Sequence, residues 1–395
     1  MAVAQYFTPT HVYFGKDCEL EIGKVLKEGG YKNVLIHYGS GSVVRSGLLK
    51  KVEDSLSEQK INFVELGGAQ PNPRLSLVRK GIELGRQEKI DLIMAVGGGS
   101  AIDSAKAISV GIPYNKDVWN FYVGKDSPAD RVPLAVVLTL SATGSEMSNS
   151  SVITNDEVNP YDKYGLNSDY IKAVYAFMNP VNTFTVSKYQ TGSGSADIMM
   201  HTLERYFHSG YGLPFTDENA ATLLKSVIAN TAKALENPED YDARANLMWA
   251  GSVSHNDFTG ACNATRGDWA CHKLEHELSA LYDVAHGAGL AAIWASWARY
   301  VCSTDYGRFA KLGKAVFEIN EKDEKTAAFK TIDAFEKTFA DMGMPVNLHQ
   351  LGLDLAEADI SLLADKATLK DKIALGDFRK LNRDDVYEIY KAANN

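Results

Sequence analysis

The strongest constraint on the fold is a series of short apolar runs in the first half of the chain. They lie at residues 33–38, 61–66, 91–96 and 132–140, and stretches with helical spacing of apolar residues separate them. The run at 91–96, D-L-I-M-A-V, is almost continuously apolar, as in a strand that is buried on both faces of its sheet. Strands that alternate with helices form β-α-β units, so the sequence predicts an α/β domain with a parallel sheet.

Two loops rich in small residues follow predicted strands. Residues 97–100, G-G-G-S, lead into a predicted helix at 101–110, and residues 141–146, S-A-T-G-S-E, follow the fourth strand. Glycines let a backbone approach a phosphate, and the first amides of a helix are unpaired donors. The G-G-G-S loop differs from the G-x-G-x-x-G fingerprint, and alone it fits a structural turn equally well. Two such loops at the carboxyl ends of parallel strands favour a dinucleotide site in a Rossmann-like domain.

The loop after the first strand bears on which dinucleotide is bound. A carboxylate at this point would bind a ribose hydroxyl and repel a 2′-phosphate. The chain has Gly39, Ser40, Gly41 and Ser42 instead, with Arg45 close by. Because nothing in this loop repels an extra phosphate, the sequence favours NADP(H) over NAD(H).

The pattern changes at about Ser187 to long amphipathic helices, with no further convincing strand. We therefore expect a dinucleotide-binding domain at 1–186 and an all-helical domain at 187–395. Ser195 is a plausible N-cap for a helix that continues through A-D-I-M-M-H-T-L-E-R. Further helices are expected at about 217–235, 241–253, 269–281, 285–302, 325–342, 355–369 and 384–393.

Histidines and a carboxylate in the second half suggest a metal site. Asp197 and His201 are four residues apart, so they share one face of a helix. His272, His276 and His286 lie within fifteen residues, although the chain has only nine histidines. One oxygen and two or three imidazole nitrogens suit Zn²⁺ or Fe²⁺ rather than Ca²⁺ or Mg²⁺. Spacing alone would pair His272 with His276 on the metal, and surface pairs or buried structural histidines remain an alternative.

Composition narrows the class of protein. A hydrophobic share of 45% with 23% charged residues is typical of a globular protein, and the net charge of −9 argues against nucleic acid or an anionic membrane as a partner. The four cysteines form no C-x-x-C pair, and neither a signal segment nor a long apolar stretch is evident. We expect a soluble cytoplasmic protein.

Eight motifs, taken in order along almost the whole chain, resemble the iron-dependent (group III) alcohol dehydrogenases. The similarity is greatest to the branch of butanol dehydrogenases and broad-range aldehyde reductases. The motifs are F-G-K at 14–16, Y-G-S-G-S at 38–42, P-N-P at 71–73, G-G-G-S-A-I-D at 97–103, L-T-L-S-A-T-G-S-E at 138–146, A-D-I-M-M-H-T-L-E at 196–204, Y-D-A-R-A-N-L-M-W-A at 241–250 and H-K-L-E-H-E-L-S-A-L-Y-D-V-A-H-G at 272–287.

This resemblance implies a dehydroquinate synthase-like fold, a homodimer, and hydride transfer between a primary alcohol or aldehyde and a nicotinamide cofactor. It implies that one Fe²⁺ or Zn²⁺ is bound by Asp197, His201, His272 and His286. His276 would then relay a proton beside the substrate instead of binding the metal. The cofactor-binding residues it implies are Gly41, Ser42, Asn72, Gly97, Gly98, Gly99, Ser100, Asp103, Thr139, Thr143 and Lys163.

Three alternatives remain open. A lyase resembling 3-dehydroquinate synthase shares the two-domain plan, but its charged substrate needs several cations, and Arg266 and Lys273 are the only ones near the predicted ligands. An enzyme of the same family that prefers NAD(H) is the second alternative. A protein that merely stores metal is the third, and it would leave both glycine-rich loops unexplained.

Overall fold

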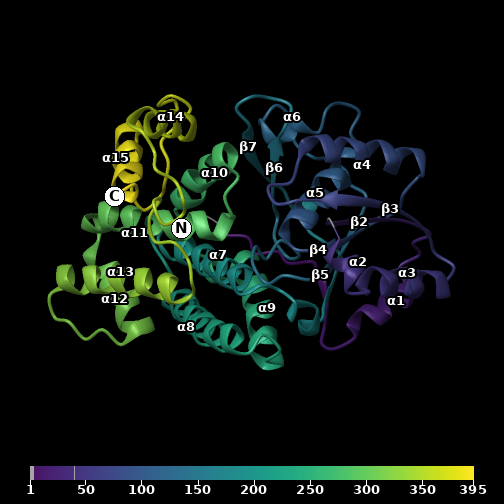
Figure 1. Cartoon of the computed structure of the whole chain (residues 1–395), viewed down its shortest axis with the longest axis horizontal. Helices are drawn as coiled ribbons and strands as arrows, with labels where there is room; N and C mark the ends of the chain where they lie inside the picture. Colours follow the sequence, from purple (N-terminus) through teal and green to yellow (C-terminus); the bar gives the residue numbers. More distant parts are fainter. Residues whose placement is uncertain (1–3, 40) are drawn as a thin grey trace. The chain divides into compact units, whose positions relative to one another are not determined.

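A six-stranded parallel sheet organises the first part of the chain in the computed structural model, which describes residues 4–39 and 41–395 (Figure 1). The strand order is β1-β8-β5-β4-β2-β3, and all neighbours are parallel. The strands are β1 (His11–Phe14), β2 (Asn33–Gly39), β3 (Asn62–Ala69), β4 (Leu92–Gly97), β5 (Leu134–Leu138) and β8 (Tyr175–Met178). The predicted parallel sheet is confirmed by β2 to β5, and the short strands β1 and β8 extend it on one side.

Each face of the sheet has its own apolar core. Helices α1 (Ile22–Glu28), α2 (Ser42–Arg45) and α3 (Leu48–Glu58) cover one face, and α4 (Leu75–Gln87) and α5 (Gly99–Gly111) cover the other (Figure 1). Alternate residues of a strand supply alternate cores, since Val34 and Ile36 pack with the first set of helices and Leu35 with the second. All residues of β4 are buried, as the continuous apolar run predicts.

The loops that follow β2 and β4 lie where the sheet connections diverge. Strand β2 leads through α3 to β3, whereas its neighbour β4 leads through α5 on the opposite face to β5. Adjacent parallel strands whose connections leave in opposite directions form a crevice at their carboxyl ends, where α/β sheets bind ligands. The fold therefore places the loops after β2 and β4 at a position suited to a dinucleotide.

An antiparallel hairpin of β6 (Ser150–Asn155) and β7 (Asp162–Asn167), which the sequence did not predict, follows the second small-residue loop. Lys106 of α5 anchors its start, because its buried ammonium donates hydrogen bonds to the carbonyls of Ser148 and Ser150 at 2.9 and 2.7 Å. Short elements complete this region: α6 (Trp119–Tyr122) and the 3-10 helices η1 (Cys18–Glu21), η2 (Asp169–Ile171) and η3 (Pro180–Thr183).

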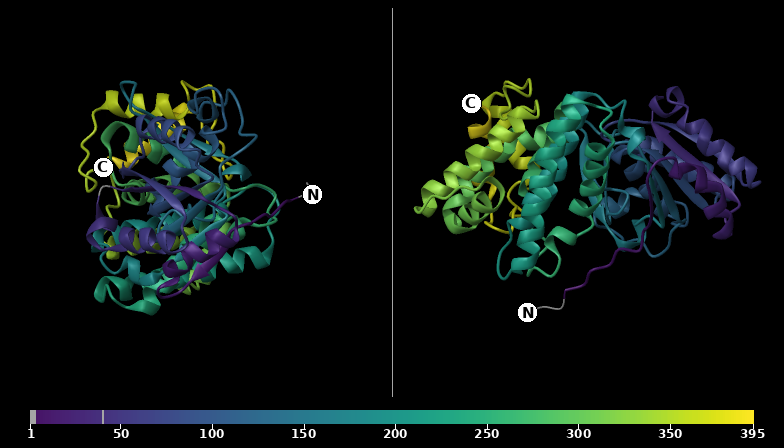
Figure 2. Two further views of the ribbon diagram at one scale, coloured as in Figure 1. Left: turned by 90° about the vertical axis from the view of Figure 1, so that its right-hand side faces the viewer. Right: turned by 90° about the horizontal axis from the view of Figure 1, so that it is seen from below.

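The second part of the chain is helical, as predicted, and no strand follows Met178 among the described residues. Its long helices α7 and α8 lie side by side (Figure 2). The helices are α7 (Lys188–Tyr206), α8 (Pro214–Glu236), α9 (Tyr241–His255), α10 (Ala270–Tyr282), α11 (His286–Val301), α12 (Tyr306–Phe317), α13 (Glu324–Asp341), α14 (Glu357–Ala367) and α15 (Arg383–Ala393), with 3-10 turns η4 (Phe258–Gly260) and η5 (Cys302–Thr304). Helix α12 was not predicted.

The expected N-cap at Ser195 is wrong. Helix α7 begins two turns earlier, and the hydroxyl of Ser187 caps it by accepting a hydrogen bond from the amide of Gln190 at 3.2 Å. Ser195 lies inside the helix, where its hydroxyl accepts a hydrogen bond from Thr231 of α8 at 2.8 Å. The G-S-G-S segment therefore acts as a surface for close packing instead of a helix start.

The chain divides into two compact units. The sheet unit comprises residues 7–186 and 239–252, and the helical unit comprises residues 4–6, 187–238 and 253–395. One passage between them lies at residues 186 and 187, and most of α9, which the sequence placed in the second domain, groups with the sheet unit. Within the described ranges, no helix is both long and apolar enough to cross a membrane.

Candidate metal centre and cofactor loops

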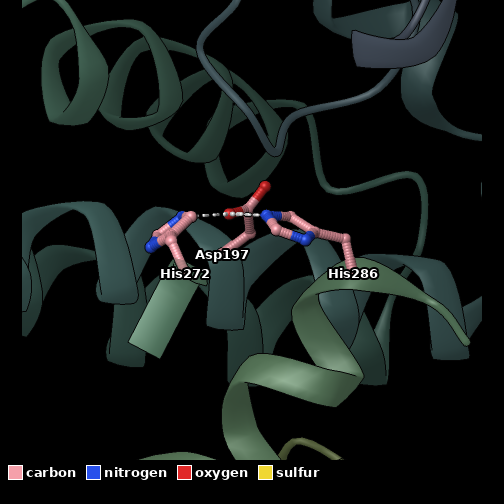
Figure 3. Close-up of side chains that lie close together, drawn as sticks. All are labelled: Asp197, His272 and His286. Carbon is pink, nitrogen blue, oxygen red and sulfur yellow. Dashed lines mark ion pairs between the residues drawn. The ribbon is translucent and has the colours of Figure 1, made fainter. Parts of the chain in front are cut away.

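Three histidines from three helices converge on one carboxylate oxygen in the helical unit. The Nε2 atoms of His201, His272 and His286 lie 3.6, 3.7 and 3.7 Å from Oδ1 of Asp197. Figure 3 shows the Asp197 carboxylate between the rings of His272 and His286. Asp197 and His201 come from α7, His272 from α10 and His286 from α11, so residues far apart in the sequence meet through the packing of these helices.

The outer nitrogens of two of these rings are bonded to buried carboxylates. Nδ1 of His272 hydrogen-bonds to Glu204, and Nδ1 of His286 hydrogen-bonds to Glu275. Because the carboxylates can only accept when ionised, each Nδ1 carries the proton and each Nε2 of a neutral ring presents a lone pair. These lone pairs face Oδ1 of Asp197, and that oxygen and Nε2 of His272 are buried without a hydrogen-bond partner among the described residues.

A divalent cation fits this arrangement. Several electron-pair donors facing one another in a buried site repel, unless a positive charge lies between them. A tetrahedral ion with bonds of about 2.0–2.2 Å holds its ligands about 3.3–3.6 Å apart, close to the separations seen here. Carboxylates behind ligand histidines are the usual support of such sites.

The same charges set opposite proton affinities on neighbouring rings. Burial acts to lower the pKa of His272, but the carboxylates of Glu204 and Asp197 outweigh it and raise the pKa to about 9. Without a metal, this ring therefore holds a second proton on Nε2, and a bound cation would replace that proton. His201 has no such carboxylate on its outer nitrogen. Burial and the positive charges of nearby histidines and Arg205 hold the pKa of His201 well below its usual range.

Close approach of α11 to α7 brings His286 to the cluster. A Cβ on Gly287 would lie 1.9 Å from the carbonyl oxygen of Ser193, and one on Gly192 would lie 2.3 Å from that of Met342. These glycines allow the helices to pack against the small-residue face of α7. The G-S-G-S segment thus positions a candidate ligand that lies far away in the sequence.

His276 lies one helical turn after His272 and is 7% exposed. Its ring centroid is 5.9 Å from that of His286 and 6.5 Å from that of His272. Spacing suggested that His272 pairs with His276. In the structure, His272 instead has its ligand atom in one group with those of Asp197 and His286. His276 lies beside the cluster, where its ring nitrogen is within 4.8 Å of ligand atoms of Glu275 and His286.

Sequence reasoning missed the supporting carboxylates, although a repeated signal marks them. His201 and Glu204 form one H-x-x-E, and His272 and Glu275 form another. In each case the glutamate supports a histidine of the next ligand-bearing helix, not of its own: Glu204 of α7 hydrogen-bonds to His272 of α10, and Glu275 of α10 hydrogen-bonds to His286 of α11. The repeat therefore links the three ligand-bearing helices in a chain.

The first glycine-rich loop forms a strand–turn–helix at the end of β4. Gly97 is the last residue of the strand, Gly98 is the N-cap of α5, and Gly99 and Ser100 are its first two residues. No side chain caps this helix. Its first amides thus suit a phosphate oxygen, which is what a dinucleotide would offer.

The second loop packs directly against the first. The amide of Thr139 donates to the carbonyl of Gly97 at 3.1 Å. A Cβ on Gly99 would lie 2.5 Å from Cγ2 of Thr143, so only glycine permits this contact. The structure therefore brings Gly97 to Gly99, Thr139 and Thr143 together as one surface.

Three polar cofactor candidates make hydrogen bonds within the protein. The carboxylate of Asp103 accepts from the hydroxyl of Ser145 at 2.6 Å and from the amide of Val152 at 2.8 Å, which ties α5 to the second loop and to the hairpin. Lys163 of β7 donates to the side-chain oxygen of Asn72 at 3.0 Å, and both side chains are buried. Asn72 and Lys163 are thus a second group, preorganised by their own contact.

The loop after β2 contains the residues expected to decide the cofactor. Gly41 has φ of +135°, which favours glycine, and Ser42 begins α2. A Cβ on Gly41 would lie 2.9 Å from Nη1 of Arg45, so the guanidinium lies against this glycine. Ser40, which belongs to the same expected loop, lies outside the described residues.

Comparison with known proteins agrees with the motifs. The family model of the iron-containing alcohol dehydrogenases matches residues 9–180, and that of the C-terminal part of the Fe-containing alcohol dehydrogenase family matches residues 191–394. The chain is 39% identical over 388 residues to NADH-dependent butanol dehydrogenase A of Clostridium acetobutylicum, with 98% of each chain covered. It is 32% identical over 389 residues to the NADPH-dependent aldehyde reductase YqhD of Escherichia coli, again with 98% of each covered.

A solved structure supports the same relationship at the level of the fold. The crystal structure of NADH-dependent butanol dehydrogenase A from Thermotoga maritima matches with a TM-score of 0.95 and 36% identity over 99% of this chain and 98% of that one. The family expected from the sequence is therefore confirmed along the whole length. The chain belongs to the iron-containing (group III) alcohol dehydrogenases, and it is an NAD(P)-dependent enzyme of a family that implies a divalent metal.

Proposed function

We propose that this enzyme interconverts butanol-like primary alcohols and their aldehydes with NADP(H) and one Fe²⁺ or Zn²⁺ ion. The observation that carries the proposal is the convergence of three imidazole nitrogens on one buried carboxylate oxygen. We assign the metal to Asp197, His201, His272 and His286. We assign the cofactor to Gly41, Ser42, Asn72, Gly97, Gly98, Gly99, Ser100, Asp103, Thr139, Thr143 and Lys163.

The residues of the chain have separable tasks in this proposal. When bound, the metal supplies a Lewis acid for the substrate oxygen, and the nicotinamide supplies the hydride chemistry. Glu204 and Glu275 keep the Nε2 lone pairs of His272 and His286 directed at the ion. His276 takes the hydroxyl proton of an alcohol, or returns it to the oxygen of an aldehyde.

Alanine substitutions of two histidines, made separately, test the assignment. His286→Ala should abolish tight metal binding and activity together, because it removes one nitrogen next to Asp197. His276→Ala should keep one metal per chain and lower turnover by about 10²- to 10⁴-fold, the usual contribution of a positioned acid or base. Metal analysis of the purified variants, with aldehyde reduction assays, measures both. Loss of metal from His276→Ala with retention by His286→Ala would overturn the assignment.

The preference for NADP(H) rests on the loop after β2. Arg45 lies against Gly41, and the described residues of that loop contain no carboxylate. Similar enzymes differ in the cofactor that their names give: the butanol dehydrogenases are named NADH-dependent, and YqhD is named NADPH-dependent. We expect a higher kcat/KM with NADPH than with NADH, and a drop of about 10-fold in that ratio for Arg45→Gln, the size of one charge-assisted hydrogen bond. A wild-type kcat/KM that is higher with NADH than with NADPH would favour an NAD(H) enzyme, and an unchanged ratio in Arg45→Gln would show that Arg45 does not set the preference.

The substrate is best defined by a panel of C2 to C8 aldehydes. We expect kcat/KM to rise towards C4, because each buried methylene adds about 0.8 kcal/mol until the pocket is filled. A maximum at C2, or activity that requires a phosphate or carboxylate on the substrate, would contradict a butanol-like specificity.

We also propose a cytoplasmic homodimer. All four cysteines are free, in keeping with a reducing compartment. Strand β1 lies at an edge of the sheet, and its Phe14 is 43% exposed, so this edge is suited to contact with a second copy. Light scattering of the purified protein should give about twice the chain mass, and a monomer at micromolar concentration would exclude the dimer.

A further inference from the structure

One ligand-position histidine lacks the support that the other two have. Nδ1 of His201 is buried and has no hydrogen-bond partner among the described residues, whereas Nδ1 of His272 and of His286 each meets a glutamate. Rotation about χ2 of a histidine is soft, so a ring without a bonded outer nitrogen must be oriented by packing.

Packing of this kind is present on both faces of the His201 ring. The ring of His255, the last residue of α9, stacks on one side with centroids 3.9 Å apart and planes within 21°. The ring of His272 stacks at 4.8 Å and 19°. His201 is therefore held in a slot between two nearly parallel rings.

His255 is itself held in one orientation. Arg205 of α7 places Nη2 3.2 Å from Nδ1 of His255. A guanidinium can only donate, so Nδ1 of His255 must accept, and the ring proton lies on Nε2. Arg205 is buried, and it also bonds to the carbonyl of Ser254 at 3.0 Å and to Asp257 at 3.1 Å. These bonds attach the end of α9 to the helix that carries His201.

We propose that His255, fixed by Arg205, is a positioning residue that orients His201 towards the metal. The inference rests on the proposed metal site, and it adds a residue that neither the motifs nor the ligand spacing pointed to. His255 takes the place that Glu204 and Glu275 take for the other two rings, with ring stacking in place of a hydrogen bond. In this arrangement, carboxylates orient the rings of His272 and His286, and the stacked ring of His255 orients His201.

Two substitutions of His255 separate stacking from other contributions. His255→Phe keeps an aromatic ring beside His201 and removes the nitrogens, whereas His255→Ala removes the ring. Affinity for Zn²⁺, measured on the full-length chain by competition with a chelator, should fall by about 10- to 100-fold in His255→Ala, the range typical of residues behind metal ligands. In His255→Phe it should stay within about 3-fold of wild type.

A second readout does not depend on activity. The visible absorption of the Co²⁺-substituted protein reports the geometry at the ion, and it should change in His255→Ala and be retained in His255→Phe. His349→Ala serves as the matched control, because this exposed histidine pairs with Asp354 at the surface. Thermal unfolding of the metal-free variants checks that each still folds.

The outcomes distinguish this inference from the site assignment on which it rests. If wild type binds no divalent metal, or if His201→Ala binds it as tightly, the proposed site itself fails. If His201→Ala loses the metal while His255→Ala matches wild type in affinity and spectrum, only the role of His255 fails. Equal losses in His255→Phe and His255→Ala would overturn stacking as the means of positioning.

Discussion

The candidate metal centre and the candidate cofactor loops are built in opposite ways. The candidate metal centre consists of polar side chains that face Asp197, and the outer nitrogens of His272 and His286 are hydrogen-bonded to buried glutamates. The cofactor loops depend on missing side chains, since Gly99 leaves the space that Thr143 occupies. One site is therefore sensitive to the removal of atoms, and the other to their addition.

Two buried histidines show the same contrast in electrostatics. His37, below the cofactor loops in β2, bonds through Nδ1 to the carbonyl of Leu66 at 2.8 Å and through Nε2 to the hydroxyl of Ser104 at 2.9 Å. With neutral partners only, burial dominates and lowers the pKa of His37 to about 4. His272, with carboxylate partners, has a pKa raised to about 9 despite similar burial. Burial alone thus lowers the pKa of a histidine with neutral partners, whereas carboxylate partners raise it.

The largest effect is expected from Asp197→Asn. The change keeps the shape of the side chain but removes the negative charge that three imidazole nitrogens face. We expect metal to be lost and kcat/KM to fall by about 10³-fold or more, since a Lewis acid contributes several kcal/mol to the transition state. Metal content and aldehyde reduction measure the two effects.

Asp103→Asn is the matched control for Asp197→Asn. Asp103 is also a carboxylate inside the fold, but its hydrogen bonds hold the second glycine-rich loop and the hairpin. It should keep one metal per chain and change the KM for the cofactor. If Asp103→Asn lost its metal as readily as Asp197→Asn does, the comparison between the two sites would fail.

A smaller effect is expected from His37, whose titration should lower the free energy of unfolding by about 2 kcal/mol between pH 7 and pH 5. Its pKa is about 4 when folded and 6.5 as the ordinary value, so the unfolded chain binds the proton first as pH falls. The stabilisation from neutral His37 is fully present above pH 6.5, and it is lost progressively between pH 6.5 and about 4.

Unfolding free energies of wild type and His37→Gln, both without metal, measure this contribution. The difference between the two proteins should shrink as pH falls from 7 to 5, because glutamine does not titrate. A difference that stays constant over this range would show that His37 is not held neutral by the fold.

The parts of this structure that could be predicted are those with a signal in neighbouring residues. The strand at 91–96 was predictable because both of its faces are buried, and it is continuously apolar as a result. The hairpin was not, since β6 and β7 consist mostly of polar residues and the contacts of Lys106 hold the start of β6. Ser195 was misjudged because a serine that follows a glycine and precedes a helical pattern resembles a helix start, whereas here it lies on a close-packed face of a helix that has already begun.

The candidate metal site could be predicted only in part, because most of its contacts join residues that are far apart in the sequence. The i, i+4 rule relates Asp197 to His201, but it cannot show that α11 returns His286 to the same oxygen. The repeated H-x-x-E is visible in the sequence, yet each glutamate serves a different helix from its own. The stacking of His255 on His201 arises entirely from how the end of α9 packs on α7.

The smallest effect we predict comes from adding one methyl group at Gly99. A Cβ there would lie 2.5 Å from Cγ2 and 2.6 Å from Oγ1 of Thr143, so the two loops must separate slightly. Overpacking of this kind costs on the order of 1 kcal/mol where a neighbour can move, and we expect the KM for the cofactor to rise about 5- to 10-fold while metal content is unchanged. Gly165→Ala is the control, because its Cβ would meet Val152 at an ordinary 3.7 Å. If Gly99→Ala lost metal but bound cofactor normally, the contrast between the two sites would be wrong. Added atoms would then disturb the metal centre instead of the cofactor loops.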